Sequence, residues 1–493
     1  MFVNLTNSIL INREKNAFFI KEFFYTYKDL AGRISAIRKS ISKQIDENEK
    51  IIGLIANDDL ETYASIFALW LEGKAYVPIA PETPLERNQN IVEEASISTV
   101  IDSSDNNYFQ DLKTISSQKL PDTVINLAPK DVSDSELVYM LFTSGTTGRP
   151  KGVPITRRNL ISFVDAFWDM NFEINSNDRC LQMFELTFDL SVMSYLIPLL
   201  KGACVYTIPK DKIKYSYIFE LMEEQELTVT LMVPSILHYL RPYFDEIALP
   251  KMKYSLFCGE ALPLDLTKEW SKCLPNARIV NVYGPTEDTI FCTYYDFNRD
   301  EINNSYNGIL SIGNSMKGNY AILVDDQNQI LANGSTGELC LGGLQLTPGY
   351  WKNEEKNEEA FFSINYAGRQ ERFYRTGDLC KTDLSGNLLY VGRIDFQTKI
   401  QGFRVELSEI EFYAKEFLKK TNVAVIAMKD HIGNTELGMV IEEKKFDTSS
   451  MLEEMKLKLP AYMIPRKIAF IDEFPLNVNG KTDRNKLEEI FHK

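Results

Sequence analysis

Strand and helix patterns alternate regularly in the first part of the chain. Short apolar runs that are typical of buried strands occupy residues 51–56, 75–79 and 98–103. Two segments with the spacing of amphipathic helices, residues 61–71 and 85–95, separate these runs. Strands that are connected through helices pair in parallel and carry the helices on their faces. The pattern therefore predicts an α/β fold.

A glycine-rich segment, LFTSGTTGRPKG at residues 141–152, continues an apolar run that begins at residue 137. Glycine lets the backbone approach a ligand closely, and consecutive N–H groups and hydroxyls form an anion-binding nest. Arg149 and Lys151 add positive charge. The spacing differs from the G-x-x-x-x-G-K-[ST] loop. The segment predicts a phosphate-binding loop, and the alternative is a surface turn before a helix that starts near Thr156.

Composition excludes several classes of partner. The chain has 493 residues, 44% apolar content and a net charge of −15, which argues against nucleic acid. Its seven cysteines have no metal-ligand or C-x-x-C spacing, which indicates reduced thiols. The N-terminus, MFVNLTNSIL, lacks a signal peptide pattern, and no apolar stretch has the length of a membrane span. We therefore expect a cytoplasmic protein without a membrane span.

Four further motifs follow the glycine-rich segment in order. They are NVYGPTE (residues 281–287), YRTGDL (374–379), GRIDFQTKIQGFRVELSEIE (392–411) and NGKTDR (479–484). This ordered set resembles the adenylate-forming enzymes, which include acyl-CoA synthetases, luciferases and the adenylation domains of peptide synthetases. The resemblance covers almost the whole chain, and several ordered motifs are far more specific than any one of them.

The resemblance implies two domains. Residues 1–393 would form a large N-terminal domain of packed α/β layers with a distorted β-barrel part. Residues 394–493 would form a small α+β lid, with a hinge at Asp395. The sequence independently predicts a change here, because helix, strand, strand, helix and strand patterns follow one another after Gly402.

The resemblance also implies an ATP and Mg²⁺ site. Lys481 would bridge the substrate carboxylate and the α-phosphate, Thr286 would contact the α-phosphate, and Glu287 would bind Mg²⁺, which prefers carboxylate oxygen. Asn281 would reach the adenine, while Asp378 and Arg393 would hold the ribose. The full set of ATP-binding residues would be Thr143, Ser144, Gly145, Thr146, Thr147, Lys151, Gly259, Glu260, Ala261, Asn281, Val282, Tyr283, Gly284, Pro285, Thr286, Asp378, Tyr390, Arg393 and Lys481.

Asp189 points to the class of substrate. It could cap the helix that follows it. In amino-acid adenylation domains, however, an Asp at this place in an FD motif pairs with the substrate α-ammonium, and a buried carboxylate needs such a cation. The residues that match the family's substrate pocket are Asp189, Leu190, Met193, Leu231, Leu256, Cys258, Val282, Ile290, Phe291 and Lys481. The apolar lining favours a small aliphatic amino acid.

Three segments, FDLSVM, FCGEALP and LPAYMIPRK, are most similar to stand-alone D-alanine–D-alanyl carrier protein ligases. D-alanine is therefore the leading substrate. Val282, Ile290 and Phe291 are bulkier than an alanine pocket needs, so proline, valine and other small apolar amino acids stay open. A stand-alone ligase that loads L-proline, or another small L-amino acid, onto a carrier protein is the main alternative.

The implied reaction has two steps. ATP would convert the amino acid to an aminoacyl-adenylate and release pyrophosphate, and a thiol would then take the aminoacyl group and release AMP. Only nine residues follow Arg484, so we expect the thiol on a separate phosphopantetheinyl carrier protein. Lys399 and Gly402 would belong to the face that the lid presents for this step.

An acyl- or aryl-CoA ligase is a further alternative, which would have no use for Asp189. A non-catalytic scaffold is disfavoured because the motif residues are intact.

Overall fold

The structure is a computed structural model of the chain. It describes residues 1–104, 106, 108–144, 149–394, 397–419, 421–475 and 482–492. Five residues with predicted roles lie outside this described part: Gly145, Thr146, Thr147, Asp395 and Lys481.

A six-stranded sheet carries the alternating pattern of the first part of the chain. Its strand order is β6-β5-β3-β4-β7-β8, and all neighbours pair in parallel except β7 and β8. The strands are β3 (Ile51–Ile55), β4 (Ala75–Ile79), β5 (Thr99–Asp102), β6 (Lys113–Ser116), β7 (Leu137–Thr143) and β8 (Lys151–Thr156). The helices of this region are α1 (Phe2–Ile11), α2 (Tyr27–Gln44), α3 (Leu60–Leu71), α4 (Leu85–Ala95) and α5 (Arg157–Asp169).

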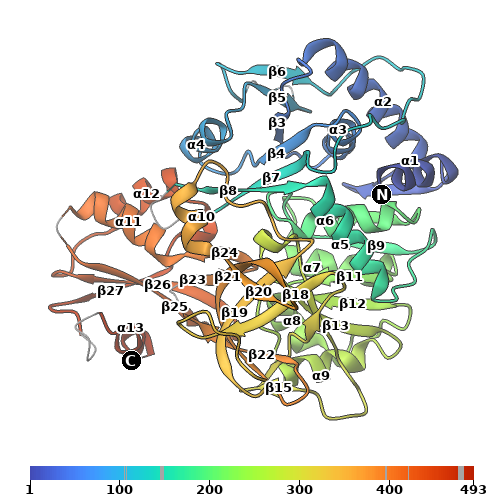
Figure 1. Ribbon diagram of the computed structural model, residues 1–493. Helices are drawn as coiled ribbons and strands as arrows, with labels where there is room; N and C mark the ends of the chain where they lie inside the picture. The colour runs from blue at the N-terminus through green and yellow to red at the C-terminus, as the bar shows by residue number, and fades with distance from the viewer. Residues whose placement is uncertain are drawn as a thin grey trace.

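A nine-stranded sheet lies beside it, in the order β17-β14-β13-β12-β11-β9-β10-β1-β2 (Figure 1). Its central strands pair in parallel, and antiparallel strands close both edges. The strands are β1 (Asn16–Ile20), β2 (Phe23–Thr26), β9 (Arg179–Gln182), β10 (Cys204–Thr207), β11 (Val229–Met232), β12 (Tyr254–Phe257), β13 (Arg278–Tyr283), β14 (Thr293–Asp296) and β17 (Asn314–Ser315). Its helices are α6 (Leu190–Leu199), α7 (Lys214–Glu224), α8 (Ser235–Leu240) and α9 (Leu264–Cys273).

The antiparallel part of the large domain is a five-stranded sheet. Strands β18, β19, β21 and β20 pair in this order, and β22 pairs with β21. The strands are β18 (Asn319–Val324), β19 (Thr336–Gly343), β20 (Phe361–Tyr366), β21 (Arg369–Thr382) and β22 (Leu388–Arg393), with helix α10 (Glu354–Ala360) before β20 and a short hairpin of β15 (Ser305–Tyr306) and β16 (Ile309–Leu310) nearby.

The C-terminal part has its own hydrophobic core, which includes Ile410, Val425 and Met439. Its elements are the hairpin β23 (Gln397–Ile400) and β24 (Phe403–Glu406), helices α11 (Leu407–Leu418), α12 (Ser449–Lys458) and α13 (Arg484–Glu488), and strands β25 (Val423–Lys429), β26 (Thr435–Glu442) and β27 (Lys467–Ile471). This α+β part lies against the large domain, with α12 next to α4 (Figure 1). The α/β fold with a large N-terminal and a small C-terminal part confirms the expected fold class.

Local sequence signals explain where several elements begin. Helix α5 starts after Thr156, whose hydroxyl accepts from the Asn159 N–H while the Asn159 side chain accepts from the Thr156 N–H, a capping box. Several strands were not predicted from the local pattern, and β8 and β6 are two of them. β8 follows the glycine-rich segment directly, and β6 lies in a polar stretch. Both are edge strands whose pairing depends on neighbours distant in sequence.

Candidate active site

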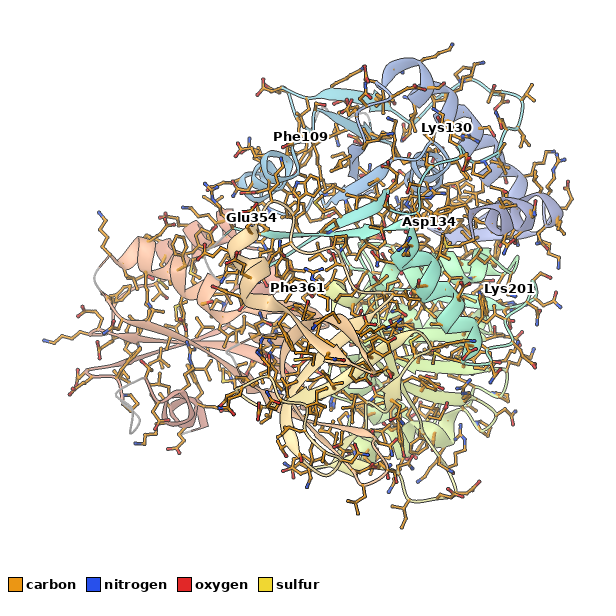
Figure 2. The ribbon with its side chains drawn as sticks, in the orientation of Figure 1. Phe109, Lys130, Asp134, Lys201, Glu354 and Phe361 are labelled. Atoms are coloured by element: carbon orange, nitrogen blue, oxygen red, sulfur yellow. The ribbon has the colours of Figure 1, made fainter. Side chains whose placement is uncertain are left out.

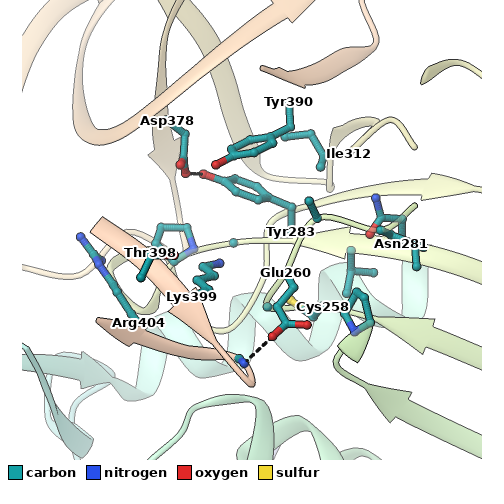
Figure 3. A pocket seen from close by; sticks show the side chains of 18 of the residues that line it. Cys258, Glu260, Asn281, Tyr283, Ile312, Asp378, Tyr390, Thr398, Lys399 and Arg404 are labelled. Carbon is teal, nitrogen blue, oxygen red and sulfur yellow. Dashed lines mark hydrogen bonds between the residues drawn. The ribbon is translucent and has the colours of Figure 1, made fainter. Parts of the chain in front are cut away.

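A cavity of about 380 Å³ lies at the carboxyl ends of β11, β12 and β13, where the β23–β24 hairpin covers them (Figure 3). Ligands of α/β proteins commonly bind in the crevice outside the carboxyl ends of parallel strands. Most predicted site residues line this cavity, although they are spread over more than 200 positions of the sequence. They are Asp189, Leu190, Cys258, Gly259, Glu260, Ala261, Asn281, Val282, Tyr283, Gly284, Pro285, Thr286, Ile290, Asp378, Tyr390, Arg393, Lys399 and Gly402.

One end of the cavity is built around Asp378 on β21. The Tyr283 hydroxyl donates to Oδ2 of Asp378, and Nη1 of Arg393 donates to Oδ1 at 3.0 Å (Figure 3). Asn281 lies deeper, and its Nδ2 donates to the carbonyl of Ser311 at 2.9 Å. Asp378 is thus held by a hydroxyl and a guanidinium, and Tyr283 offers an aromatic face beside it. These four residues line the same cavity, and their contact with the sugar and base of a nucleoside stays a prediction.

Glu260 connects this wall to the hairpin. Its Oε1 accepts from the Gly402 N–H at 2.9 Å, and its Oε2 accepts from the Ser235 N–H at 2.8 Å (Figure 3). Burial raises the pKa of Glu260, and the two amides partly offset that effect. Because Gly402 has a φ of +86°, a side chain there would be strained, and its Cβ would lie 2.6 Å from the Val233 side chain.

Asp189 forms another part of the wall and is only 6% exposed. It stands before α6, but its side chain makes no capping hydrogen bond, and its backbone is already helical. The capping interpretation is therefore wrong. Its Oδ2 is buried without a hydrogen-bond partner among the described residues. Burial raises the pKa of Asp189 to about 7, although Thr286 and the Ile290 N–H act in the opposite direction. The positive charge of Lys399 also lowers the pKa, but within the described part of the chain no cation forms an ion pair with this carboxyl.

Four of the predicted pocket residues do not line the open cavity. Met193, Leu231, Leu256 and Phe291 are 0–3% exposed and pack in the large hydrophobic core together with Leu190, Cys258, Val282 and Ile290. The ring of Phe291 meets Phe163 edge-on at a centroid distance of 5.0 Å. These four residues support the wall from behind, and their contact with a substrate stays a prediction.

Glu287 is fully buried and ionically paired. Nη1 of Arg404 lies 3.0 Å from its Oε1 and 2.9 Å from its Oε2, and the Tyr350 hydroxyl donates to Oε1 at 2.7 Å. Burial opposes ionisation of Glu287, but Arg404 and Tyr350 outweigh it and hold the pKa below its ordinary value. Phe361 is the first residue of β20 (Figure 2), and its ring packs on Tyr350 and Tyr374, which lie beside this pair.

The chemistry of this carboxylate fits a divalent cation. Glu287 already holds its charge in a dry environment and carries a cationic group on both oxygens. Within the described part of the chain, no group of three or more His, Cys, Asp or Glu side chains could hold a metal on its own. Mg²⁺ is commonly bound by one or two carboxylates together with substrate phosphates. Glu287 is therefore suited to holding a magnesium–nucleotide complex.

The described ends of the glycine-rich segment flank this cavity. The hydroxyl of Ser144 donates to the carbonyl of Arg404 at 2.9 Å, and Thr143 lines a smaller neighbouring cavity. Lys151 lies 3.9 Å from Glu406 and 5.2 Å from the ring centroid of Tyr350. Burial and the nearby Arg404 lower the pKa of Lys151. A bound anion would favour its charged form.

The opposite end of the cavity is formed by both parts of the chain. Phe188, Pro234 and His238 come from the large domain, while Gly402 and Gly433 come from the C-terminal part. The ammonium group of Lys399 lies 5.9 Å from the ring centroid of Tyr283, between the two ends (Figure 3). The cavity thus extends from the Asp378 wall to a region that residues of the large domain and of the C-terminal part line together.

Sequence reasoning missed Arg404, Tyr350 and His238. Arg404 lies within the motif of residues 392–411, but a single arginine gives no sign that it pairs with a carboxylate 117 positions away. Tyr350 follows a Pro-Gly pair and looks like an ordinary aromatic residue. Their roles depend on contacts between segments that are distant in the sequence.

Comparisons with known proteins agree with this geometry. The family model of the AMP-binding enzyme matches residues 10–351. The D-alanine–D-alanyl carrier protein ligase of Bacillus cytotoxicus is 30% identical over 496 residues, which cover 96% of each chain. A linear gramicidin synthase of Brevibacillus parabrevis is 31% identical over 489 residues. The chain spans 9% of that synthase and 42% of tyrocidine synthase 1 of the same organism.

Solved structures share the fold. The Vibrio cholerae adenylation domain AlmE, in complex with glycyl-adenosine-5'-phosphate, matches with a TM-score of 0.86 and 25% identity over 99% of this chain and 97% of that one. PA1221, which contains adenylation and PCP domains, matches in its holo form with a TM-score of 0.85 over 98% and 83%. No described helix is long and apolar enough to cross a membrane. The chain belongs to the family of AMP-binding enzymes.

Proposed function

We propose that the chain is an AMP-forming ligase that activates a small apolar amino acid, with D-alanine as the leading candidate, and transfers it to a separate phosphopantetheinyl carrier protein. ATP is converted to AMP and pyrophosphate in the process. The observation that carries the amino-acid assignment is Asp189, a buried carboxyl at the cavity wall whose Oδ2 has no partner in the described structure. An α-ammonium group would supply the missing cation. A fatty or aryl acid would leave this carboxyl uncompensated.

The wall near Asp189 favours a small side chain. Cys258, Val282 and Ile290 are each 1–2% exposed, and the residues behind them are tightly packed. A larger or polar side chain would lose hydrogen bonds or displace core residues. D-alanine leads because D-alanyl carrier protein ligases match the chain end to end. AlmE, whose complex contains a glycyl adenylate, is a second relative with a small amino acid.

The chain's own residues position the reactants for attack of the substrate carboxylate on the α-phosphate. Asp378 and Arg393 would hold the ribose, Asn281 and Tyr283 the base, and Thr286 the α-phosphate. A new P–O bond forms as the bond to pyrophosphate breaks, so positioning and charge neutralisation supply most of the catalysis. Mg²⁺ bound at Glu287 would neutralise phosphate charge. The bridging role of Lys481 stays part of this proposal.

The end of the cavity that both parts of the chain line suits the thiol step. A phosphopantetheine arm could enter at the end of the cavity that His238 and Gly433 line and pass Gly402, where a side chain would collide with Val233. Its thiol would attack the adenylate carbonyl, form a thioester and release AMP. Lys399 lies along this path and adds positive charge near the leaving phosphate. The similarity to PA1221, which joins adenylation and PCP domains, is consistent with a carrier-bound thiol.

We further propose that residues 394–493 move as a unit about Asp395 between the two steps. Arg404 occupies both oxygens of Glu287 in the present arrangement. A metal ion at Glu287 would compete with the guanidinium for these oxygens and would be repelled by its positive charge. Adenylation therefore requires the β23–β24 hairpin to leave, and thiol transfer follows when Arg404 returns. The present arrangement corresponds to the thiol-transfer state.

The proposal is tested by amino-acid-dependent exchange of pyrophosphate into ATP, measured across all L-amino acids together with D-alanine, D-valine and D-proline. A dominant D-alanine signal is the expected result. A dominant L-proline signal, or one for another small L-acid, would instead assign the enzyme to the loading of that acid onto a carrier. Exchange only with fatty or aryl acids would overturn the role of Asp189 and indicate an acyl- or aryl-CoA ligase.

A further inference from the structure

The loop between β13 and β14, residues 284–292, presents several site residues on a strained backbone. Thr286 and Ile290 line the cavity, and Glu287 lies beneath them. Thr289 and Ile290 have φ values of +50° and +76°. Both are β-branched, and such residues rarely adopt this strained conformation. The loop keeps this shape only if its surroundings hold it.

The neck of the loop is closed by backbone contacts. The N–H of Cys292 donates to the carbonyl of Tyr283 at 2.9 Å. A Cβ on Gly284 would lie 2.3 Å from the Cα of Phe291, so the two strands of the neck approach as closely as glycine allows. These contacts fix the ends of the loop but leave the carbonyls at its turn to be satisfied elsewhere.

The buried amide of Gln345 satisfies them. Gln345 follows β19 and is fully buried. Its Nε2 lies 3.2 Å from the carbonyl of Asp288, 3.1 Å from that of Thr289 and 2.9 Å from that of Phe291. Its own backbone carbonyl accepts from the Thr289 hydroxyl at 2.5 Å. One side-chain amide thus lies within hydrogen-bonding distance of three carbonyls of the strained turn.

Asn319 fixes which way this amide points. Its Nδ2 donates to Oε1 of Gln345 at 2.6 Å, so Nε2 must face the loop. Asn319 is itself buried at 6% exposure. If the Gln345 amide were reversed, its oxygen would face three carbonyl oxygens in a dry interior, which is strongly unfavourable. The two amides therefore form an oriented pair beneath the site.

We propose that Gln345, oriented by Asn319, is a positioning residue that sets the placement of Glu287, Thr286 and Ile290 for adenylation. Gln345 touches neither substrate nor nucleotide and acts through the loop backbone. The N–H of Thr347, two residues on, also donates to the carbonyl of Glu287 at 2.9 Å, so the same segment holds the loop at both ends of the turn. Loss of the amide donors would release the strained turn and move the carboxylate and the pocket wall together.

Two variants test this inference in the full-length enzyme. Gln345→Met keeps the length of the side chain and removes both amide groups. Asn319→Leu leaves Gln345 in place but removes the amide that donates to its Oε1, so the Gln345 side chain loses the partner that orients it. We expect kcat for pyrophosphate exchange with D-alanine to fall about 10- to 100-fold in both variants, as for other residues that orient ligands indirectly. The preference for D-alanine over D-valine should narrow, because Ile290 shifts.

Amide hydrogen exchange gives a readout that does not depend on activity. Backbone amides of residues 284–292 should exchange faster in both variants, with little change elsewhere. The matched control is Asn303→Leu. Asn303 is a buried amide whose Nδ2 donates to the carbonyls of Asn298 and Glu301, in a loop that contributes nothing to the cavity. It should lower thermal stability without changing kcat by more than about twofold.

Three results would overturn the positioning role. The first is that the amide hydrogen exchange of residues 284–292 is unchanged in both variants. The second is that both variants keep kcat for pyrophosphate exchange within about twofold of the wild type, and the third is that Asn303→Leu loses as much kcat as they do. The inference rests on the adenylation step of the proposed function. If the wild-type enzyme shows no pyrophosphate exchange with any amino acid, the proposed function is wrong. Amide hydrogen exchange of residues 284–292 would still decide whether Gln345 holds the loop.

Discussion

Two buried carboxylates lie close to the same cavity but differ in their partners. Glu287 has a guanidinium on both oxygens and a pKa below its ordinary value, whereas Asp189 has an unpartnered oxygen and a pKa of about 7. Glu287 is therefore charged before any ligand arrives, and its cation comes from the C-terminal part. Asp189 becomes favourably charged only when a ligand brings a cation. We therefore expect the pairing of Glu287 to depend on the position of the C-terminal part, and we propose that Asp189 selects the substrate.

The largest effect is expected from removal of the selecting carboxylate. Asp189→Ala should lower kcat/KM for the amino acid about 100- to 1,000-fold, because the substrate ammonium would then be buried without a partner. Pyrophosphate exchange measures this loss. Asp58→Asn is the matched control, because Oδ2 of Asp58 is also buried without a hydrogen-bond partner but lies outside the cavity. Full activity of Asp189→Ala would mean that the substrate has no ammonium group at this position.

Removal of the cation on Glu287 should separate the two half-reactions. Arg404→Leu leaves Glu287 buried and uncompensated whenever the hairpin docks, at a cost of about 3–5 kcal/mol. We expect transfer from the adenylate to pantetheine to fall about 100-fold and pyrophosphate exchange to fall much less. Single-turnover measurements of each step test this.

The control for this variant is Arg375→Leu, which breaks the pair of Arg375 and Glu338 in the five-stranded sheet, two residues that do not themselves line the cavity. It should lower stability and leave the ratio of the two rates unchanged. If Arg404→Leu slowed both half-reactions equally, Arg404 would not be specific to the thiol step, and the proposed exchange of cations at Glu287 would be wrong.

The contrast between the carboxylates also shows what the sequence can and cannot predict. The alternation of strands and helices predicted the parallel sheets, and Thr156 predicted the start of α5, because both signals are local. The ordered motifs predicted that Asn281 and Asp378 lie in one site, because the resemblance to a family also implies its fold. Both residues line the same cavity. Asp189 was recognised as a candidate on the same basis, while its unpartnered oxygen became evident only in the structure.

The missed features are all long-range. Arg404 pairs with a residue 117 positions away, and Gln345 holds a loop 54 to 57 positions away. Neither residue type is unusual for its local sequence. Whether a polar side chain is buried, and which carbonyl or carboxylate it meets, depends on how separate segments pack. Leu256 and Phe291 were predicted to line the pocket, but they pack behind its wall. The sequence could not show this, because it does not determine which apolar side chains the neighbouring segments cover.

The smallest effect concerns pH. Because burial raises the pKa of Asp189 to about 7, the free enzyme carries a neutral carboxyl at lower pH. The value of kcat/KM for the amino acid should fall about tenfold per pH unit below about 7, since only the ionised form binds the ammonium. A pH profile of pyrophosphate exchange at low amino-acid concentration measures this acid limb.

The titration of Asp189 affects the free energy of unfolding in the opposite direction to kcat/KM. A raised pKa in the folded state favours the protonated enzyme, so the stabilisation that is present below about pH 4 is lost as the pH rises towards 7. Asp189→Asn should therefore be more stable than the wild type at pH 8.

Asp288 is the critical control for the pH profile of kcat/KM, because burial also raises its pKa to about 7, yet it does not line the cavity. The acid limb of the kcat/KM profile should persist in Asp288→Asn, and its loss there would assign the titration to Asp288 and leave Asp189 ionised in the free enzyme.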